Sequence, residues 1–301
     1  MLAPSKLSLI ENHPLAPLTT LRVGGSARYF VTVTTKQEAV RAVELARQSG
    51  WRFYLLGNGS NLYFDDAGFD GLIIHNRIRE GEKIDSDHPE IWSAGAGVSL
   101  PQLALRAGRE GWGGLEFGVG IPGSVGGAIV MNAGASGSSI SDCLLSIECY
   151  DQEGYKHLSR EEIVFGYRSS PFQKGETIIL SAKFLLKRDP EAKKIQQASM
   201  DYRRSTQPYG LPSAGCIFRN PQSNGSAQSA GALIDLAGLK EMTCEGAQIS
   251  SLHANFMINT GQATSKGVSQ LIARVRKTIL EMHGIELTPE MIYVPPDGGR
   301  Q

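Results

Sequence analysis

The sequence predicts an α+β fold with more than one domain, and three observations point to it. The chain has 301 residues, which is more than one small core usually serves. Segments typical of strands and of helices are mixed without the strict βαβ order of a doubly wound sheet. Glycine is enriched, and its 35 residues gather in a few short stretches rather than in repeats. Such clusters are typical of backbone that turns sharply or approaches a ligand closely.

The first half of the chain predicts several strands and two helices. β-Branched and aromatic residues predict a strand over 28–35, and Thr35 is the expected N-cap of a helix that stops at Gly50. Further strands are expected over 53–57, 72–75 and 91–98, and a second helix, capped by Ser99, over 100–109.

The second half predicts a hairpin, a long strand and a separate module. The hairpin is expected over 143–159, and Ser159 with Glu162 forms a capping box for a short helix over 161–167. The Pro, Gly, Ser and Asn content of 209–231 marks the entry to a C-terminal module. The other expected elements are a strand over 177–187, a helix from Asp189 to about Arg204, a helix over 229–240, a strand over 255–259 and a helix over 265–282.

Composition excludes several classes of function. Lys and Arg together number 30, as do Asp and Glu, and this balance argues against binding to nucleic acid or to an anionic membrane. No apolar run is long enough to span a bilayer, and the N-terminus lacks the apolar core of a signal peptide. The four cysteines, at 143, 149, 216 and 244, have no CxxC spacing, so no metal is expected. We therefore expect a cytoplasmic monomer with reduced thiols.

Two glycine-rich loops suggest a site for a diphosphate. The stretch 117–141 holds no charged residue, and Pro122 stands where a helix could begin. The N–H groups of the next three residues would then suit a pyrophosphate, whereas the alternative is a tightly packed buried connection. LGNGSN at 56–61 follows a strand and is a second such loop. Neither loop matches an ATP-binding P-loop or a Rossmann fingerprint, so two loops on one pyrophosphate suggest a flavin.

A series of short blocks resembles one family of flavoenzymes. RVGG, LGNGSN and IPGSVGGAIVMNAGA are similar, in this order, to the flavin-binding part of the UDP-N-acetylenolpyruvoylglucosamine reductase family. The later blocks FGYRSSPF, PSAGCIFRNP, AGALIDLAGLK, HANFMIN and GIELTPEM resemble the same family in the same order. The resemblance runs from about Thr19 to Met291 and is closest to the shorter variety of the family.

The resemblance implies a fold and a division into domains. The implied fold is a two-subdomain FAD-binding unit of the flavin-oxidase (PCMH) type plus a C-terminal α+β substrate domain. The expected boundaries are 1–68 and 69–204 for the two FAD-binding subdomains and 205–301 for the substrate domain. The last residues could return to the FAD-binding unit.

The resemblance also implies a reaction and a cofactor. The family reduces an enolpyruvyl ether on UDP-N-acetylglucosamine to the lactyl ether of UDP-N-acetylmuramate, in peptidoglycan precursor synthesis. NADPH supplies the electrons, and hydride passes from N5 of non-covalent FAD to C3 of the enolpyruvyl group. The cofactor-binding positions correspond here to Gly57, Asn58, Gly59, Ser60, Asn61, Pro122, Gly123, Ser124, Val125, Gly126, Gly127, Asn132, Ala133 and Gly134.

Three residues correspond to the catalytic groups of the family. Arg168 would grip the substrate carboxylate in a planar fork and stabilise the enolate. Cys216 would protonate C2, since a thiol with an ordinary pKa of about 8.5 gives up a proton more readily than a hydroxyl. Glu290, as a neutral acid, would donate to the enolate. The competing interpretations are a helix cap for Arg168, packing for Cys216 and a solvent-exposed side chain for Glu290.

The substrate's diphosphate and uridine are expected to contact the C-terminal module. Asn220 matches a substrate contact of the family, and Arg219 and Tyr209 are further candidates. His253 and Asn255 would flank the same site, although a structural role is the alternative for the histidine. Thr288 and Ile292 depart from the family pattern, which commonly has an acid and a base at these positions.

Two other functions stay open on the sequence alone. Another FAD-dependent oxidoreductase with the same flavin-binding fold would keep the cofactor and change the reaction. Such oxidases often carry a flavin tethered to a histidine or cysteine, and His13, near the first flavin block, has no clear attachment signal. A flavin-free sugar-nucleotide binding protein would show no flavin absorbance after reconstitution.

Overall fold

The computed structural model describes residues 7–80, 83–223 and 226–298, and it divides into two compact units. Unit 1 contains Tyr29–Asn58 and Leu72–Tyr202, together with the chain before Glu11. Unit 2 contains Glu11–Arg28, Gly59–Gly71 and the chain from Arg203 onward. Each unit is therefore assembled from separate stretches of sequence. The three domains expected from the sequence differ from these units in their boundaries and stay a prediction.

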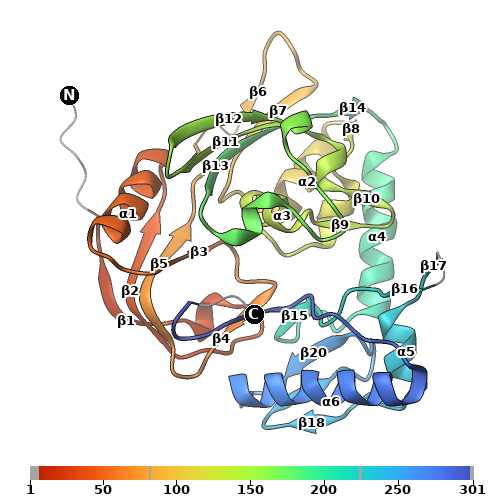
Figure 1. Ribbon diagram of the computed structural model, residues 1–301. Coiled ribbons are helices and arrows are strands. Elements are labelled where there is room, and N and C mark those ends of the chain that lie inside the picture. The colour runs from red at the N-terminus through yellow and green to blue at the C-terminus, as the bar shows by residue number, and fades with distance from the viewer. Residues whose placement is uncertain (1–6, 81–82, 224–225, 299–301) are drawn as a thin grey trace. The chain divides into compact units, whose positions relative to one another are not determined.

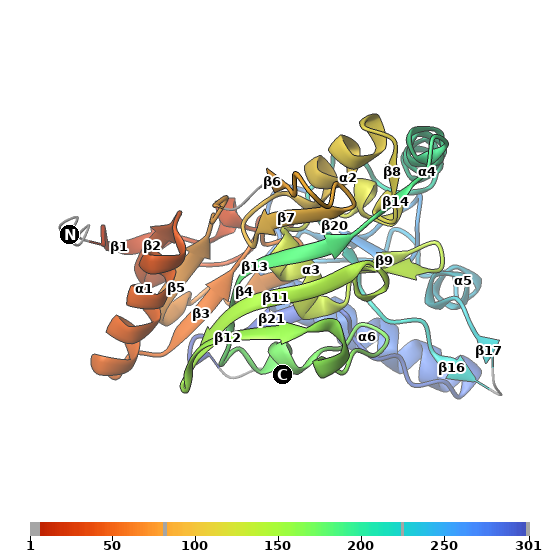
Figure 2. The same ribbon diagram turned by 90° about the horizontal axis from the view of Figure 1, so that it is seen from above.

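A five-stranded antiparallel sheet forms the centre of unit 1, packed against α2 (Leu100–Arg109) and α3 (Val125–Met131). The strands are β6 (Lys83–Ile84), β7 (Ile91–Gly95), β11 (Leu144–Asp151), β12 (Gly154–Ser159) and β13 (Ile178–Leu185). Their order is β12-β11-β13-β7-β6, and Figures 1 and 2 show β11 between β12 and β13. Trp92 and Phe184, which face each other across β7 and β13, are fully buried in this core.

A second sheet carries α1 (Lys36–Gln48) on one face. Its strands are β1 (Ile10–Pro14), β2 (Ser26–Val33), β5 (Phe69–Asn76) and β3 (Phe53–Leu56), in the order β1-β2-β5-β3. The unit boundaries fall within β2 and β5. Thr35 caps α1 in a capping box with Glu38, as the sequence predicts for the N-cap. The apolar face of α1 packs on Val31, Leu72 and Ile74.

Unit 2 is built around a four-stranded antiparallel sheet and one long helix. The strands are β15 (Ser213–Cys216), β18 (Thr243–Cys244), β19 (Ala247–Ile249) and β20 (Phe256–Asn259), in the order β15-β20-β19-β18. Figure 1 shows α6 (Ser265–His283) running beside this sheet, and its residues Val268, Leu271 and Val275 are fully buried. The shorter helix α5 (Ala230–Leu236) packs in the same core.

One strand pair joins segments of unit 2 from opposite ends of the chain. β21 (Ile292–Val294) pairs in parallel with β4 (Leu62–Phe64), in the register Ile292 opposite Leu62. The expected return of the last residues to the FAD-binding unit stays a prediction, because both strands of this pair lie in unit 2. The remaining elements are β8 (Trp112–Gly113), β9 (Gly134–Ala135), β10 (Ser138–Ser139), β14 (Lys187–Arg188), β16 (Gln222–Ser223), β17 (Ser226–Ala227), α4 (Ala192–Thr206) and 3₁₀ turns at Ala16–Leu18, Glu116–Gly120, Ile140–Asp142, Arg160–Glu162 and Pro171–Lys174.

The predicted helix over 161–167 is wrong. The capping box of Ser159 and Glu162 forms, but it opens only the 3₁₀ turn Arg160–Glu162. Beyond this turn, the N–H and C=O of Gly166 both bond with Ser169, at 3.0 and 3.1 Å. The carbonyl of Gly166 also accepts a hydrogen bond from Asn132 Nδ2 at 2.9 Å. These contacts hold the segment in a tight turn instead of a helix.

Candidate active site

The predicted site residues fall into both units. Unit 1 contains Gly57, Asn58, residues 122–127 and 132–134, and Arg168. Unit 2 contains Gly59, Ser60, Asn61, Cys216, Glu290, Tyr209, Arg219, Asn220, His253 and Asn255. Within the described ranges, no group of three or more His, Cys, Asp or Glu side chains is placed to hold a metal ion. No helix in the described part of the chain is long and apolar enough to cross a bilayer.

The first glycine loop follows β3 and turns at Gly59. Gly59 has a φ of +62°, and a Cβ there would lie 2.1 Å from the carbonyl oxygen of Leu18. The Gly59 carbonyl accepts the N–H of Thr20 at 3.0 Å. Glycine alone satisfies both the positive φ and the close approach, so the sequence fixes this turn. In the preceding part of the loop, Arg77 Nη1 donates to Asn58 Oδ1 at 3.1 Å.

The end of the first loop is joined to the segment that carries Glu290. Asn61 Nδ2 donates to the carbonyl oxygen of Glu290 at 3.1 Å, and the Asn61 carbonyl accepts the N–H of Ile292 at 3.0 Å. β4 begins at the next residue and pairs with β21. Within unit 2, the loop end and the candidate acid are therefore held together by backbone and amide hydrogen bonds.

The second glycine loop leads into α3. Ser124 is the N-cap, and its Oγ accepts the N–H of Gly127 at 3.2 Å. The expectation that the N–H groups of Gly123 and Val125 face a ligand is wrong. Gly123 donates to the carbonyl of Ile121 at 2.7 Å, and Val125 donates to that of Val98 at 2.8 Å. The chain that follows β7 therefore accepts the hydrogen bond from Val125, and the turn before α3 accepts the one from Gly123.

The two loops meet within unit 1. A Cβ on Gly57 would lie 2.5 Å from Ser124 Oγ, so the first loop packs directly on the N-cap of α3. Gly126 is also needed for packing, because its Cβ would lie 3.0 Å from the Cβ of Ala96. Gly127 differs, since it is exposed and its Cβ would approach only Ser124 Oγ, at 3.3 Å. The protein's own packing leaves the face at Gly127 bare, which fits close approach of a flavin diphosphate.

Arg168 lies in the tight turn after the 3₁₀ segment. Its backbone has a φ of +53°, and its Nη2 donates to the carbonyl of Gly134 at 2.7 Å. The guanidinium also lies over the ring of Tyr167, 5.3 Å from the centroid. The helix that a capping arginine would have closed is absent from this segment, so that interpretation of Arg168 no longer applies. Arg168 is instead attached to the end of the second glycine loop.

Asn132 links the end of α3 to this turn, which is a structural role rather than a ligand contact. It is buried, ends α3 in the left-handed conformation with a φ of +43°, and donates through Nδ2 to Gly166. Its Oδ1 accepts the N–H of Ser141 at 3.3 Å. The neighbouring Ala133 N–H is likewise used within α3, by the carbonyl of Ala128 at 2.8 Å. We expected the Asn132 amide to contact the cofactor, but in the structure this side chain forms hydrogen bonds with the protein backbone.

The segments that carry Cys216 and Glu290 lie side by side in unit 2. The Glu290 N–H donates to the carbonyl of Ile217 at 2.7 Å, and the Arg219 N–H donates to the carbonyl of Thr288 at 2.9 Å. Both Cys216 and Glu290 are half-buried. The sequence proposed a thiol and a carboxyl for one site, and the structure brings their backbones together.

Arg219 and Asn220 follow Cys216 on the same segment. Arg219 Nε is buried and has no hydrogen-bond partner among the described residues. Such a donor is costly unless an acceptor arrives. Asn220 is exposed, and its Oδ1 accepts the N–H of Ala230 at 3.0 Å, beside the N-cap Ser229 of α5. Tyr209 precedes this segment and has an exposed side chain.

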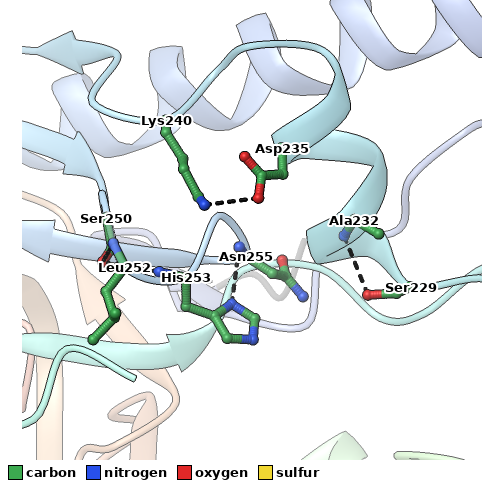
Figure 3. Close-up of polar contacts among 8 residues, drawn as sticks. All are labelled: Ser229, Ala232, Asp235, Lys240, Ser250, Leu252, His253 and Asn255. Carbon is green, nitrogen blue, oxygen red and sulfur yellow. Dashed lines mark hydrogen bonds and ion pairs between the residues drawn. The ribbon is translucent and has the colours of Figure 1, made fainter. Parts of the chain in front are cut away.

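Figure 3 shows His253 and Asn255 next to each other, near the ion pair of Lys240 and Asp235. The Asn255 N–H donates to His253 Nδ1 at 3.2 Å, which places the ring proton on Nε2. Burial lowers the pKa of His253, so the ring is neutral at pH 7. The nearby Lys240–Asp235 ion pair, at 2.7 Å, is also drawn in Figure 3. Asn255 is only 3% exposed, and its side-chain amide bonds to the backbone of Phe218 rather than pointing outward.

Two features near the site were not predicted from the sequence. Ser229 caps α5 next to Asn220, and the only local signal was a serine before a short helical pattern. Unit 1 also contains a pocket of about 490 Å³ that begins beside Ala135, just after the second glycine loop. Its lining includes Glu116 and Arg188, which are far apart in sequence, so no local pattern could have predicted it.

Comparison with known proteins decides the family. Residues 27–158 match the FAD binding domain family, and residues 207–294 match the C-terminal domain of UDP-N-acetylenolpyruvoylglucosamine reductase. The UDP-N-acetylenolpyruvoylglucosamine reductase of Protochlamydia amoebophila is 46% identical over 287 residues, covering 95% of this chain and 94% of the relative. The chain belongs to the UDP-N-acetylenolpyruvoylglucosamine reductase family.

Two further members of the reductase family support this assignment. The enzyme of Chlamydia trachomatis serovar L2 is 43% identical and covers 96% of this chain and 97% of its own. The crystal structure of the reductase from Thermus caldophilus superposes with a TM-score of 0.79 at 36% identity, covering 96% and 98% of the two chains. The α+β fold class predicted from the sequence, with an FAD-binding unit and a C-terminal domain, is confirmed. As a member of this reductase family, the chain is a flavin-dependent oxidoreductase with FAD as cofactor.

Proposed function

We propose that this chain reduces the enolpyruvyl ether of UDP-N-acetylglucosamine to the lactyl ether of UDP-N-acetylmuramate, in peptidoglycan precursor synthesis. NADPH is the reductant, and the FAD is bound without a covalent link. Family membership supports FAD-dependent reduction of this substrate. The observation that supports the finer assignment is the hydrogen bond between the Glu290 N–H and the Ile217 carbonyl, because it holds the backbone of Glu290 next to the residue that follows Cys216.

The reaction adds a hydride to C3 and a proton to C2 of the enolpyruvyl double bond, while NADPH becomes NADP⁺. When FAD is bound, the hydride reaches C3 by way of the flavin. Negative charge then develops at C2 and on the adjoining carboxylate, and fixed donors contribute most where such charge develops. We assign the proton to Cys216, whose thiolate then takes a proton from solvent.

Two further side chains act on the developing charge. Arg168 binds the substrate carboxylate, and its geometry supports this role because one edge of the guanidinium is anchored on Gly134. Glu290, as a neutral acid, donates a hydrogen bond to the enolate oxygen. Asn61 and Ile217 hold the backbone of Glu290 on either side.

The diphosphate is assigned to the segment after Cys216. The buried Arg219 Nε lacks an acceptor among the described residues, and a diphosphate oxygen would satisfy it. Asn220 adds an amide donor, and neutral His253 carries its proton on Nε2 for donation to the nucleotide. We assign Tyr209, whose ring is exposed, to stacking on uracil.

The spectrum of the purified protein tests the proposal. Denaturation should release free FAD, NADPH should bleach the flavin absorbance under anaerobic conditions, and enolpyruvyl UDP-N-acetylglucosamine should restore it. Bleaching without restoration would identify another FAD-dependent oxidoreductase, and a flavin that stays with the denatured chain would indicate a covalent link. The monomeric state and the cytoplasmic location stay predictions, which size-exclusion chromatography and cell fractionation test.

A further inference from the structure

The side chain of Asn255 bonds both main-chain polar groups of one residue. Oδ1 of Asn255 accepts the N–H of Phe218 at 2.9 Å, and its Nδ2 donates to the Phe218 carbonyl at 2.8 Å. We call residues 216–220 the acid loop, because they carry Cys216 together with Arg219 and Asn220. The amide of Asn255 therefore grips the middle of the acid loop.

The backbone of Asn255 is fixed as well. Its carbonyl accepts the N–H of Ile217 at 2.8 Å, and its own N–H donates to His253 Nδ1 at 3.2 Å. The His253 ring packs edge-to-face on Phe256, with centroids 4.7 Å apart. These contacts of the Asn255 backbone hold its side-chain amide in place. The position of the amide therefore determines the position of Phe218.

The sheet itself does not supply these bonds. β15 pairs with β20 at Ser213 and Cys216, with a register shift between them, and Gly215 has a φ of +77°. Past Cys216 the regular ladder ends, and a buried backbone still needs partners. On one side of the acid loop residues 288–291 provide them. On the other side, the Asn255 side chain forms the hydrogen bonds that a neighbouring strand would otherwise form with the acid loop.

We propose that Asn255 is a positioning residue that fixes the acid loop, and that it does not touch the substrate. This inference rests on the proposed function, because it assigns the proton donor to Cys216. Asn255 is 3% exposed, and both ends of its amide are bonded to Phe218. Loss of the amide should therefore loosen Cys216, Arg219 and Asn220 together.

The first test removes the amide. Enzyme with Asn255→Ala is reduced by dithionite under anaerobic conditions and mixed with enolpyruvyl substrate, and flavin reoxidation is followed by stopped flow. We expect reoxidation to slow on the order of tenfold or more, because a small displacement of reacting groups has a large effect on rate. Wild-type enzyme that is not reoxidised would refute the proposed function. Normal reoxidation in both wild type and variant would refute only the role of Asn255.

Asn259→Ala is the matched control. Asn259 lies on the same strand, is 9% exposed, and also uses both ends of its amide. Its Nδ2 donates to the carbonyl of Leu21 at 3.0 Å, and its Oδ1 accepts the N–H of Gly261 at 2.7 Å. The control should lose stability, yet reoxidise at the wild-type rate. An equal slowing in both variants would mean that Asn255 acts only through general stability.

A second variant remains informative if the alanine variant fails to fold. Asn255→Asp has the same shape, and when protonated it can donate to the Phe218 carbonyl as the amide does. When ionised, it sets a negative oxygen against that carbonyl instead. The reoxidation rate relative to wild type should therefore rise as pH falls from 8.5 to 5.5. A ratio that stays flat over this pH range, with the fold intact, overturns the proposal.

The alkylation rate of Cys216 reports on the acid loop and can be measured without enzyme turnover. The rate of Cys216 alkylation by iodoacetamide is measured by peptide mass spectrometry, with the half-buried Cys244 of the same molecule as reference. Asn255→Ala should change the ratio of the two rates by about threefold or more, and Asn259→Ala should leave it unchanged. An unchanged ratio in Asn255→Ala would contradict the role of Asn255, whatever the enzyme reduces.

Discussion

At the scale of single residues, Arg168 is one of seven described non-glycine residues with a positive φ. A φ of +53° is uncommon outside glycine, asparagine and aspartate, and such strain costs on the order of 1 kcal/mol or more. A glycine would relieve the strain, but it would remove the guanidinium that reaches Gly134 and lies over Tyr167. The contacts with Gly134 and Tyr167 orient the guanidinium, and this supports the carboxylate-binding role proposed for it.

Arg168→Lys tests that role. Lysine keeps the charge but loses the two-pronged geometry, so reoxidation of the reduced flavin by substrate should slow on the order of a hundredfold. Flavin reduction by NADPH should stay near the wild-type rate. Arg160→Lys is the control, since Arg160 also bonds backbone carbonyls and lies over an aromatic ring, 4.9 Å from the Phe165 centroid. Equal losses in both half-reactions would point to a structural role for Arg168.

Cys216 offers a test that separates chemistry from packing. Cys216→Ser should keep substantial activity because a hydroxyl fills a similar volume and can still donate a proton. Cys216→Ala should bind FAD and accept hydride from NADPH, yet fail to turn over the substrate. Stopped flow on the alanine variant decides the matter, and normal reoxidation would remove Cys216 from the mechanism. Cys244→Ala is the control.

Alkylation adds a second check on Cys216. Burial raises the pKa of Cys143 to about 12 and that of Cys149 to about 11, so these thiols should stay protonated and slow to react. Alkylation of Cys216 should inactivate the enzyme, and bound substrate should protect it. Slow alkylation without protection is the result that a packing cysteine would give.

At the scale of elements, Gly126 and Gly127 in the first turn of α3 should respond differently to valine. Gly126→Val must push against Ala96 and should lower the melting temperature of the FAD-free protein. Gly127→Val meets only Ser124 Oγ, so the FAD-free protein should melt near the wild-type temperature. Its side chain would, however, occupy the bare face of the loop, and added FAD should no longer raise the melting temperature. Stoichiometric FAD on Gly127→Val would contradict the assignment of this loop.

Asp65, which contacts Ser265 at the start of α6, should make the stability of the fold depend on pH. Burial raises the pKa of Asp65, but hydrogen bonds from Tyr293 Oη at 2.6 Å, the Ala67 N–H and Ser265 Oγ outweigh it and hold the pKa below its ordinary value. The stabilisation is therefore complete above the pKa of the unfolded chain, about 3.9, and is lost as pH falls through the lower folded value.

Urea denaturation at pH 7 and in steps down to pH 3 checks this sign. Asp65→Asn should lower the free energy of unfolding at pH 7 and make its fall toward acid shallower than in wild type. Asp70→Asn is the control, because its ion pair with Arg28 is exposed on both sides. A parallel loss of stability at every pH would show that the charge of Asp65 is not the cause.

Local signals predicted elements better than they predicted the site. The helix expected over 100–109 is present as α2 and that expected over 265–282 as α6, since apolar spacing is a local signal. The cap expected from the Ser99 side chain is wrong, because Ser99 stands at the N-cap of α2 without a side-chain hydrogen bond. The failure at 161–167 has a distant cause, because Asn132 draws Gly166 into a turn. The contact of Glu290 with Ile217 and the grip of Asn255 on Phe218 likewise depend on tertiary register. The sequence supplied candidate residues for the site through a resemblance, but not their roles in holding one another.

At the scale of the whole molecule, β4 from the first quarter of the sequence meets β21 from its last tenth inside unit 2. A chain that stops after Met291 lacks β21, leaves β4 without its partner strand and removes the bond from Tyr293 to Asp65. We expect limited proteolysis to degrade unit 2 of this truncated chain and to spare a fragment of unit 1. A chain that stops after Gly298 keeps β21 and serves as the control. Equal resistance of the two chains would refute the importance of this strand pair.

The pairing of β21 with β4 also sets an order of events during synthesis. Most of unit 1 has left the ribosome when Tyr202 is made, whereas β4 waits for the last part of the chain. At about 5–20 residues per second, the remaining stretch takes on the order of 5–20 seconds. During this interval the edge of β4 is open to chaperones, and Asn61 has neither Glu290 nor Ile292 to bond with. We therefore expect unit 2 to reach its protease-resistant form only after termination of translation, and ribosome-bound chains should remain sensitive to protease in this unit.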